Sequence, residues 1–152
     1  MSDEHENDDA PPGAGIVNLA WAGTGAFVAV AAGGVLAPDG MGPVVAGLSL
    51  VLFSVGCVAF LWSYGIAIGR SRHDQISIAG LYFLSGGSAP RDVRRRLLVA
   101  LAVQVVAAVA AASIRPFTSV AFGVLVPVFG LGLCGLWAAR YGTFERRPAQ
   151  AG

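Results

Sequence analysis

The sequence predicts an all-α integral membrane protein, a bundle of four transmembrane helices that form two antiparallel hairpins with both termini in the cytoplasm. Three observations predict this fold. Hydrophobic residues make up 55% of the 152 residues and another 21 are glycine, while charged residues make up 12%, about half of the roughly 25% that is typical of soluble domains. The apolar residues fall into four long stretches, and the arginines gather on one side of them.

The same composition excludes several classes of protein. A chain of this length cannot hide so many apolar residues in a small soluble domain, and it is too hydrophobic to be disordered throughout. Its two cysteines, Cys57 and Cys134, are too few for a secreted disulfide scaffold. A formal net charge of +1 gives no basis for a nucleic-acid partner.

Residues 1–15 differ sharply from the rest of the chain. This segment has five acidic residues and no basic one, followed by Pro11 and Pro12. Such a polar, acidic segment has nothing to bury, so we expect a disordered cytoplasmic tail. A signal peptide begins with basic residues, and we therefore expect the first hydrophobic segment to be retained as a membrane span.

Four stretches are long enough to cross the membrane, for which an α-helix needs about 20 apolar residues. They are residues 16–36, 44–69, 97–114 and 119–139, which together define a transmembrane domain over 16–139. The third is short, and we expect its helix to begin at Pro90 because proline suits the first helical turn. Proline-containing breaks at 37–43 and at Arg115-Pro116 separate the two helices of each hairpin.

The arginines predict the orientation. All ten basic residues are arginine, and nine of them lie in the loop 70–96 or in the short tail 140–152. The positive-inside rule therefore places this loop and both termini in the cytoplasm. The absence of lysine, together with abundant alanine and glycine, is typical of a GC-rich bacterial genome. We thus expect a multi-pass protein of a bacterial cell membrane.

Small residues and one amide are candidates for helix packing. Gly25, Ala29 and Gly33 repeat every fourth position in the first span, and Gly65 and Gly69 form a GxxxG motif in the second. Helices in lipid pack through such small residues, either within one chain or against a partner or a second copy. Gln104 lies near the middle of the membrane, where an interhelical hydrogen bond would satisfy its amide. Pro127 predicts a kink in the fourth span.

The cytoplasmic loop has two predicted features. Asp74 is placed to cap a short helix that ends near Gly86, with an apolar face suited to the membrane interface at Ile76, Ala79, Gly80, Phe83 and Leu84. A cluster of basic residues follows, whose candidate role is contact with anionic lipid headgroups, with a cytoplasmic partner, or with the acidic residues 3–9 of the chain's own tail: Arg91, Arg94, Arg95 and Arg96.

The spans contain no Asp, Glu, His, Lys or Arg in their interiors. Proton relays and ion-coupling sites usually need such a residue, and no motif indicates catalytic groups, a metal site or a cofactor. We therefore expect a non-catalytic accessory, scaffold or assembly protein, not an enzyme, whose partners are membrane lipids and a membrane protein or a second copy. The alternative is a subunit of an oligomeric small-molecule transporter or channel, with a lumen lined by Gln104, Thr24, Ser49 and Ser54.

Overall fold

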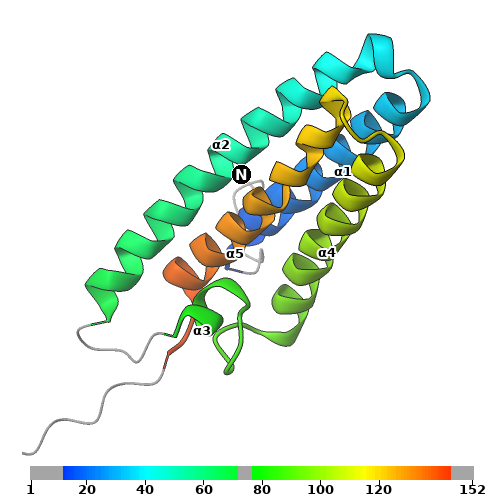
Figure 1. Cartoon of the computed structure of the whole chain (residues 1–152). Helices are drawn as coiled ribbons and strands as arrows, with labels where there is room; N and C mark the ends of the chain where they lie inside the picture. The colour runs from blue at the N-terminus through cyan, green and yellow to red at the C-terminus, as the bar shows by residue number, and fades with distance from the viewer. Residues whose placement is uncertain (1–11, 72–76, 145–152) are drawn as a thin grey trace, which may run out of the picture.

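The computed structural model describes residues 12–71 and 77–144 and contains no strand within them (Figure 1). Three long helices are α1 (Ala14–Leu36), α2 (Pro38–Arg70) and α4 (Arg91–Ile114). The fourth span is divided into a 3-10 helix, η1 (Ser119–Leu125), and α5 (Pro127–Tyr141), while α3 (Ile78–Tyr82) lies between α2 and α4. Four helical segments are thus long and apolar enough to cross a membrane, which confirms the all-α class and the prediction of four segments with the length and composition of membrane spans.

The break between the first two spans is shorter than the sequence indicates. Residues 38–43, predicted as part of a turn, belong to α2, and only Ala37 separates α1 from α2. Pro38 occupies the first turn of the helix, where the missing N–H costs no hydrogen bond. Pro43 lies only one turn further and removes a single bond near the helix end. The helix of the third span, α4, begins at Arg91, directly after Pro90.

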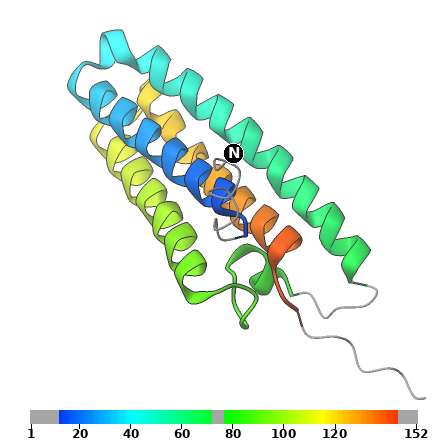
Figure 2. The same cartoon turned by 180° about the vertical axis from the view of Figure 1, so that it is seen from behind.

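The central helix of the bundle is α5. It contacts each of the other four α-helices, and Figures 1 and 2 show it between α2 on one side and α1 and α4 on the other. In the most apolar 18-residue stretch of η1–α5, 50% of the residues are buried. The corresponding share is 28% in each of the other three spans. α2 and α5 run in the same direction, because successive residues of α2 meet successive residues of the fourth span, from Gly42 against Ser119 to Ser63 against Gly135.

The short helix α3 closes one end of the bundle, which we call the α3 end. Ser77 caps it by accepting a hydrogen bond from the Gly80 N–H at 2.9 Å. The Tyr82 ring stacks on Phe60 of α2 with 4.3 Å between centroids, and its hydroxyl donates to the Phe60 carbonyl at 3.3 Å. Burial raises the pKa of this phenol above its ordinary value, against a smaller opposing effect of a hydrogen bond with Ser63.

This arrangement corrects the predicted interfacial helix. The cap is Ser77, and Gly80, Leu81, Tyr82 and Leu84 are buried against the bundle instead of facing lipid. Phe83 and Ala79, predicted on the same apolar face, are exposed. Asp74 and Ile76 lie outside the described residues. The prediction failed because Tyr82 packs on Phe60 of α2 and against Gly135 of α5, and the loop sequence alone does not indicate these partners.

Two arginines bind helix ends. At the α3 end, Arg70 donates hydrogen bonds to the carbonyls of Ala139 (2.9 Å) and Gly142 (3.3 Å), and its guanidinium lies 5.4 Å from the centre of the Phe144 ring. At the opposite end, Arg115 donates twice to the Val35 carbonyl, at 3.0 and 3.2 Å. The last carbonyls of a helix lack intrahelical partners, so each arginine satisfies groups that would otherwise need water.

Candidate functional site

α2 and α5 approach each other closely at Gly56 of α2 and Gly132 of α5. A Cβ on Gly56 would lie 2.5 Å from both the Cα and the N of Phe129, and a Cβ on Gly132 would overlap the Gly56 carbonyl oxygen. Both obstacles are backbone atoms, which cannot rotate away. The absence of side chains at these two positions is therefore what allows α2 and α5 to meet. Gly132 is one of the small residues of the fourth span that suit helix packing, with Gly123, Gly130 and Gly135, but no sequence pattern pairs it with Gly56.

The predicted small-residue motifs lie elsewhere. A Cβ added at Gly25, Gly65 or Gly69 would have no neighbour within 4 Å, and Ala29 is exposed. Gly33 alone has a contact within the chain, because its Cβ would lie 3.1 Å from the Met41 methyl group. These motifs do not bring the described helices of this chain together. Their other interpretation, contact with a partner or with a second copy, stays a prediction.

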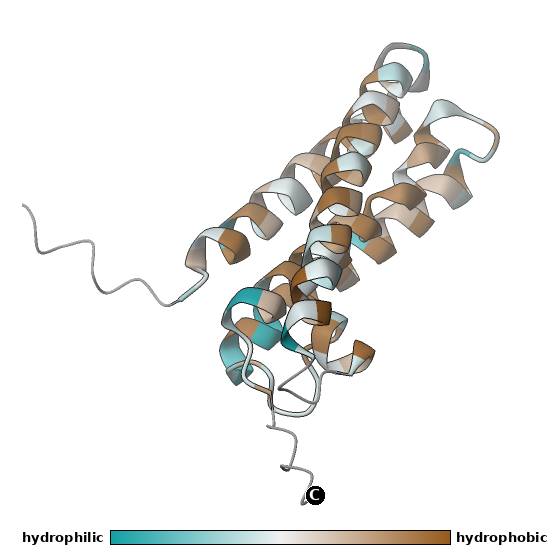
Figure 3. Cartoon of the chain, turned by 90° about the vertical axis from the view of Figure 1, so that its left-hand side faces the viewer, coloured by the Kyte–Doolittle hydropathy of each residue, from teal (hydrophilic) through white to brown (hydrophobic). Residues whose placement is uncertain are grey.

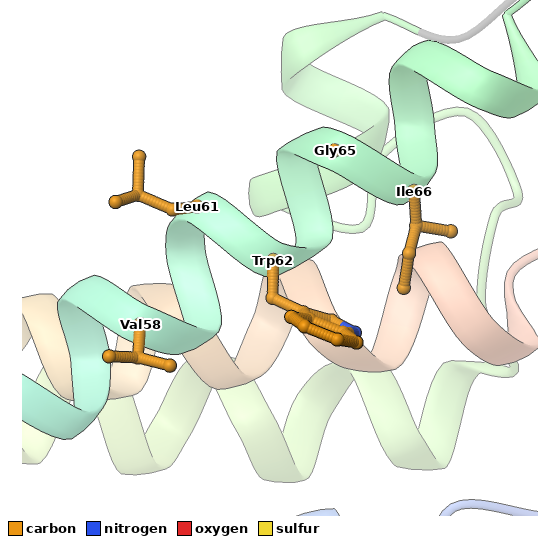
Figure 4. A pocket seen from close by; sticks show the side chains of 5 residues that line it. All are labelled: Val58, Leu61, Trp62, Gly65 and Ile66. Carbon is orange, nitrogen blue, oxygen red and sulfur yellow. The ribbon is translucent and has the colours of Figure 1, made fainter.

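Gly65 lies in a shallow apolar hollow on the outer side of α2. The hollow has a volume of about 540 Å³ and is lined by Val58, Leu61, Trp62, Gly65 and Ile66. Figure 4 shows Trp62 and Ile66 projecting from the same side of α2, with Leu61 on the opposite edge. Leu61 and Trp62 are 68% and 60% exposed. This surface is available to lipid tails or to another apolar helix.

Gln104 joins three helices through one buried chain of hydrogen bonds. Its Nε2 donates to Thr24 Oγ1 of α1 at 2.7 Å, and Thr24 donates in turn to the Ala20 carbonyl at 2.7 Å. Its Oε1 accepts from the Gly130 N–H of α5 at 3.2 Å. Gln104 is fully buried. The amide thus has the interhelical partners that its mid-span position predicts.

Pro127 marks a change of helix type. The residues before it form the 3-10 helix η1, and α5 begins at the proline itself. A proline cannot donate to the carbonyl four residues earlier, which is that of Gly123. The Val126 N–H donates to this carbonyl instead, at 3.0 Å. The freed Gly123 carbonyl is therefore satisfied locally, and the Gln104 amide binds the N–H of Gly130 just beyond the break.

Three of the four predicted arginines share a surface on α4. Arg91, Arg94 and Arg95 line a hollow of about 460 Å³ that continues over the apolar residues Leu98, Val99 and Ala102. Arg96 is exposed but does not line it. We call Arg91, Arg94 and Arg95 the arginine surface. Figure 3 shows that hydrophilic residues gather at this end of the molecule and that hydrophobic residues run along the helices.

The electrostatics of the arginine surface are unfavourable within the described chain. The three guanidinium groups lie in the first two turns of α4, where the helix dipole is positive. Asp92 lies in the first turn, but no ion pair joins it to these arginines among the described residues. Cations at a helix N-terminus cost rather than add stability. An anion from outside the described chain would relieve this repulsion.

The four residues proposed to line a lumen do not share one surface. Gln104 and Thr24 are buried and bonded to each other, whereas Ser54 is exposed and donates to the Leu50 carbonyl at 2.8 Å. Ser49 is fully buried, and its hydroxyl has no hydrogen-bond partner.

The described part of the chain also has no group of three or more His, Cys, Asp or Glu side chains that could hold a metal ion.

Comparison of the chain with protein-family models, with curated proteins and with solved structures finds no match.

Proposed function

We propose that this protein is a non-catalytic accessory or scaffold protein of a bacterial cell membrane. Its four spans form two antiparallel hairpins with both termini and the α3 end in the cytoplasm, the orientation that nine of the ten arginines favour. The arginine surface holds the chain against anionic lipid headgroups. The outward faces of α1 and α2 dock a partner membrane protein.

The observation that carries the proposal is the arginine surface itself. Arg91, Arg94 and Arg95 line one hollow in the first two turns of α4, near its positive end, and no carboxylate among the described residues pairs with them. Each arginine near a membrane surface gains about 1 kcal/mol from anionic lipid, which would offset the repulsion among them. The apolar residues directly above, Leu98, Val99 and Ala102, then continue into the hydrocarbon.

The distribution of polar groups in the bundle supports a role at its surfaces. The buried amide of Gln104 binds other helices of the same chain and leaves no polar row along the spans. Meanwhile Val58, Leu61 and Gly65 form an exposed apolar face on α2. A protein that acts by docking needs such surfaces and does not need a polar route through its centre.

Site-directed photo-crosslinking in native membranes tests the proposal. A photoreactive residue at Leu61 is expected to give one stoichiometric adduct with a single membrane protein, and the same residue at Val106, which is 68% exposed on α4, serves as the control. Exchange of all three arginines for glutamine is expected to weaken binding to anionic vesicles and to leave zwitterionic vesicles unaffected. Crosslinking only to lipid at both positions would contradict the docking role, and unchanged vesicle binding would contradict the lipid role.

A further inference from the structure

The α3-end halves of α1 and α2 are separated by a groove whose floor is α5. Figure 2 shows α5 between α1 and α2 on this side of the molecule. The groove has a volume of about 480 Å³, within the roughly 300–1,000 Å³ of pockets that hold small ligands. Its walls are almost entirely apolar, and its lining residues are Leu19 from α1, five residues of α2 between Ser54 and Trp62, and Leu133, Leu136 and Arg140 from α5.

Few polar groups line this groove, and they lie at different depths along it. The hydroxyl of Ser54 is already bonded to the Leu50 carbonyl. Arg140, in the last turn of α5, is exposed and makes no hydrogen bond or ion pair to another residue that the structure describes. Trp62 is 60% exposed, and Figure 4 shows its ring extending from α2. Its neighbour Ser63 contacts Gly135, five residues before Arg140 in α5, so Trp62 lies about 9 Å deeper in the bundle than Arg140.

Arg140 is the one charged residue that lines the groove among the described residues, and it lies at the mouth. α1 begins at Ala14 with neither a side-chain cap nor an acidic residue in its first turn, and the amino-terminal end of a helix carries a partial positive charge. This end lies near Arg140, because Gly13 contacts Trp137 and Tyr141 on either side of that arginine in α5. The described residues include two carboxylates, Asp39 and Asp92, and neither lines the groove.

We propose that this groove is a binding site for one anionic phospholipid from the leaflet at the α3 end. An acyl chain lies along the apolar walls, the phosphate meets the Arg140 guanidinium, and the Trp62 indole N–H donates to the polar region of the lipid below the phosphate. The charge of the mouth selects an anionic lipid over a zwitterionic one. The site is separate from the arginine surface on α4, and the proposal requires only that the helices lie in a membrane.

Native mass spectrometry of the full-length protein tests the site. The protein is equilibrated with an equimolar mixture of phosphatidylglycerol and phosphatidylcholine, and the retained lipids are counted. One phosphatidylglycerol is expected to be retained preferentially. Arg140→Gln is expected to reduce the preference about fivefold, which is the factor that one arginine contributes near an anionic surface. Arg96→Gln, which removes the same charge at the same end but outside the groove, is expected to have no effect.

A second pair of variants tests the apolar part of the groove. Val55→Trp fills the groove and is expected to lower retention of the lipid, while Val51→Trp, one turn away on the same helix and outside the groove, is expected to retain it. Equal retention in all four variants would overturn the proposal. Loss of the lipid in Arg96→Gln but not in Arg140→Gln would also overturn it. A purified dimer crosslinked through Val58→Cys that excludes lipid would show instead that a second copy fills the groove.

Discussion

Replacing Gly56 by alanine tests the packing of α2 on α5 directly. The new Cβ would lie 2.5 Å from two backbone atoms of Phe129, whereas ordinary van der Waals contact is 3.4–4 Å. The two helices must therefore separate by about 1 Å, and neither obstacle is a side chain that can move aside. Overpacking of this kind typically lowers the free energy of unfolding by about 1–3 kcal/mol. We expect a cost near the upper end, about 3 kcal/mol, here, because the new Cβ meets backbone atoms.

Gly65→Ala is the matched control. It lies in the same helix, it makes the same chemical change, and its Cβ meets nothing within 4 Å. Alanine favours a helix over glycine by about 1 kcal/mol at either position, so this contribution cancels when the two variants are compared. We expect Gly56→Ala to have a free energy of unfolding about 3 kcal/mol below that of Gly65→Ala.

Reversible unfolding by SDS in mixed micelles, followed by far-UV circular dichroism, measures this difference. Gly69→Ala, which also has no neighbour at its Cβ, should behave like Gly65→Ala. If the free energies of unfolding of Gly56→Ala and Gly65→Ala lie within about 0.5 kcal/mol of each other, α2 and α5 do not meet as closely at Gly56 as described.

Three further substitutions have expected outcomes in the same unfolding assay. Gln104→Leu removes two interhelical hydrogen bonds and should lower the free energy of unfolding by about 1–3 kcal/mol, since such bonds are each worth about 0.6–1.7 kcal/mol in membranes; an unchanged value would contradict the buried chain of bonds. Ser49→Ala should leave the value unchanged or raise it by up to about 1 kcal/mol, because the hydroxyl is buried without a partner; a clear loss would reveal a bond that the structure lacks. Arg70→Met removes the bonds to the Ala139 and Gly142 carbonyls and should speed amide hydrogen exchange at residues 139–144 without affecting the turn at Ala37. Equal protection in both proteins would contradict the role of Arg70 at the helix end.

The class of the fold could be predicted from the sequence because it depends on short-range properties. A run of about 20 apolar residues must become a helix in lipid, where no water satisfies the backbone, and the four runs correspond to the four helical segments. Pro127 likewise predicts a local disturbance, since a missing N–H acts on the preceding turn. The structure contains that disturbance as a 3-10 helix.

The packing could not be predicted, because it depends on which helices meet. With 21 glycines in the chain, small residues at fourfold spacing occur on several faces, and those at Gly25 and Gly65 face outward. The useful signal was the concentration of glycine in the fourth span, at Gly123, Gly130, Gly132 and Gly135. A helix with small residues on several faces can approach several neighbours at once, as the central helix α5 does.

The contacts of individual arginines could not be predicted from the sequence for the same reason. Counting them predicts an orientation, but their individual contacts depend on tertiary neighbours. Arg70 and Arg115 bind the carbonyls of helix ends about 70 and 80 residues away in the chain, which no local pattern indicates. Arg140 was counted only as a charge in the tail, and its place at the mouth of a groove follows from the separation of α1 and α2.

The orientation of the helices in the membrane is the central claim, and cysteine labelling in intact cells tests it most directly. Cys57 and Cys134 are first replaced by alanine, and a single cysteine is placed at Phe117, in the exposed turn between α4 and η1, or at Phe83, exposed at the α3 end. A membrane-impermeant thiol reagent should label the cysteine at 117 in intact cells and the cysteine at 83 only after lysis. Labelling of position 83 in intact cells, or of both positions equally, would contradict the account.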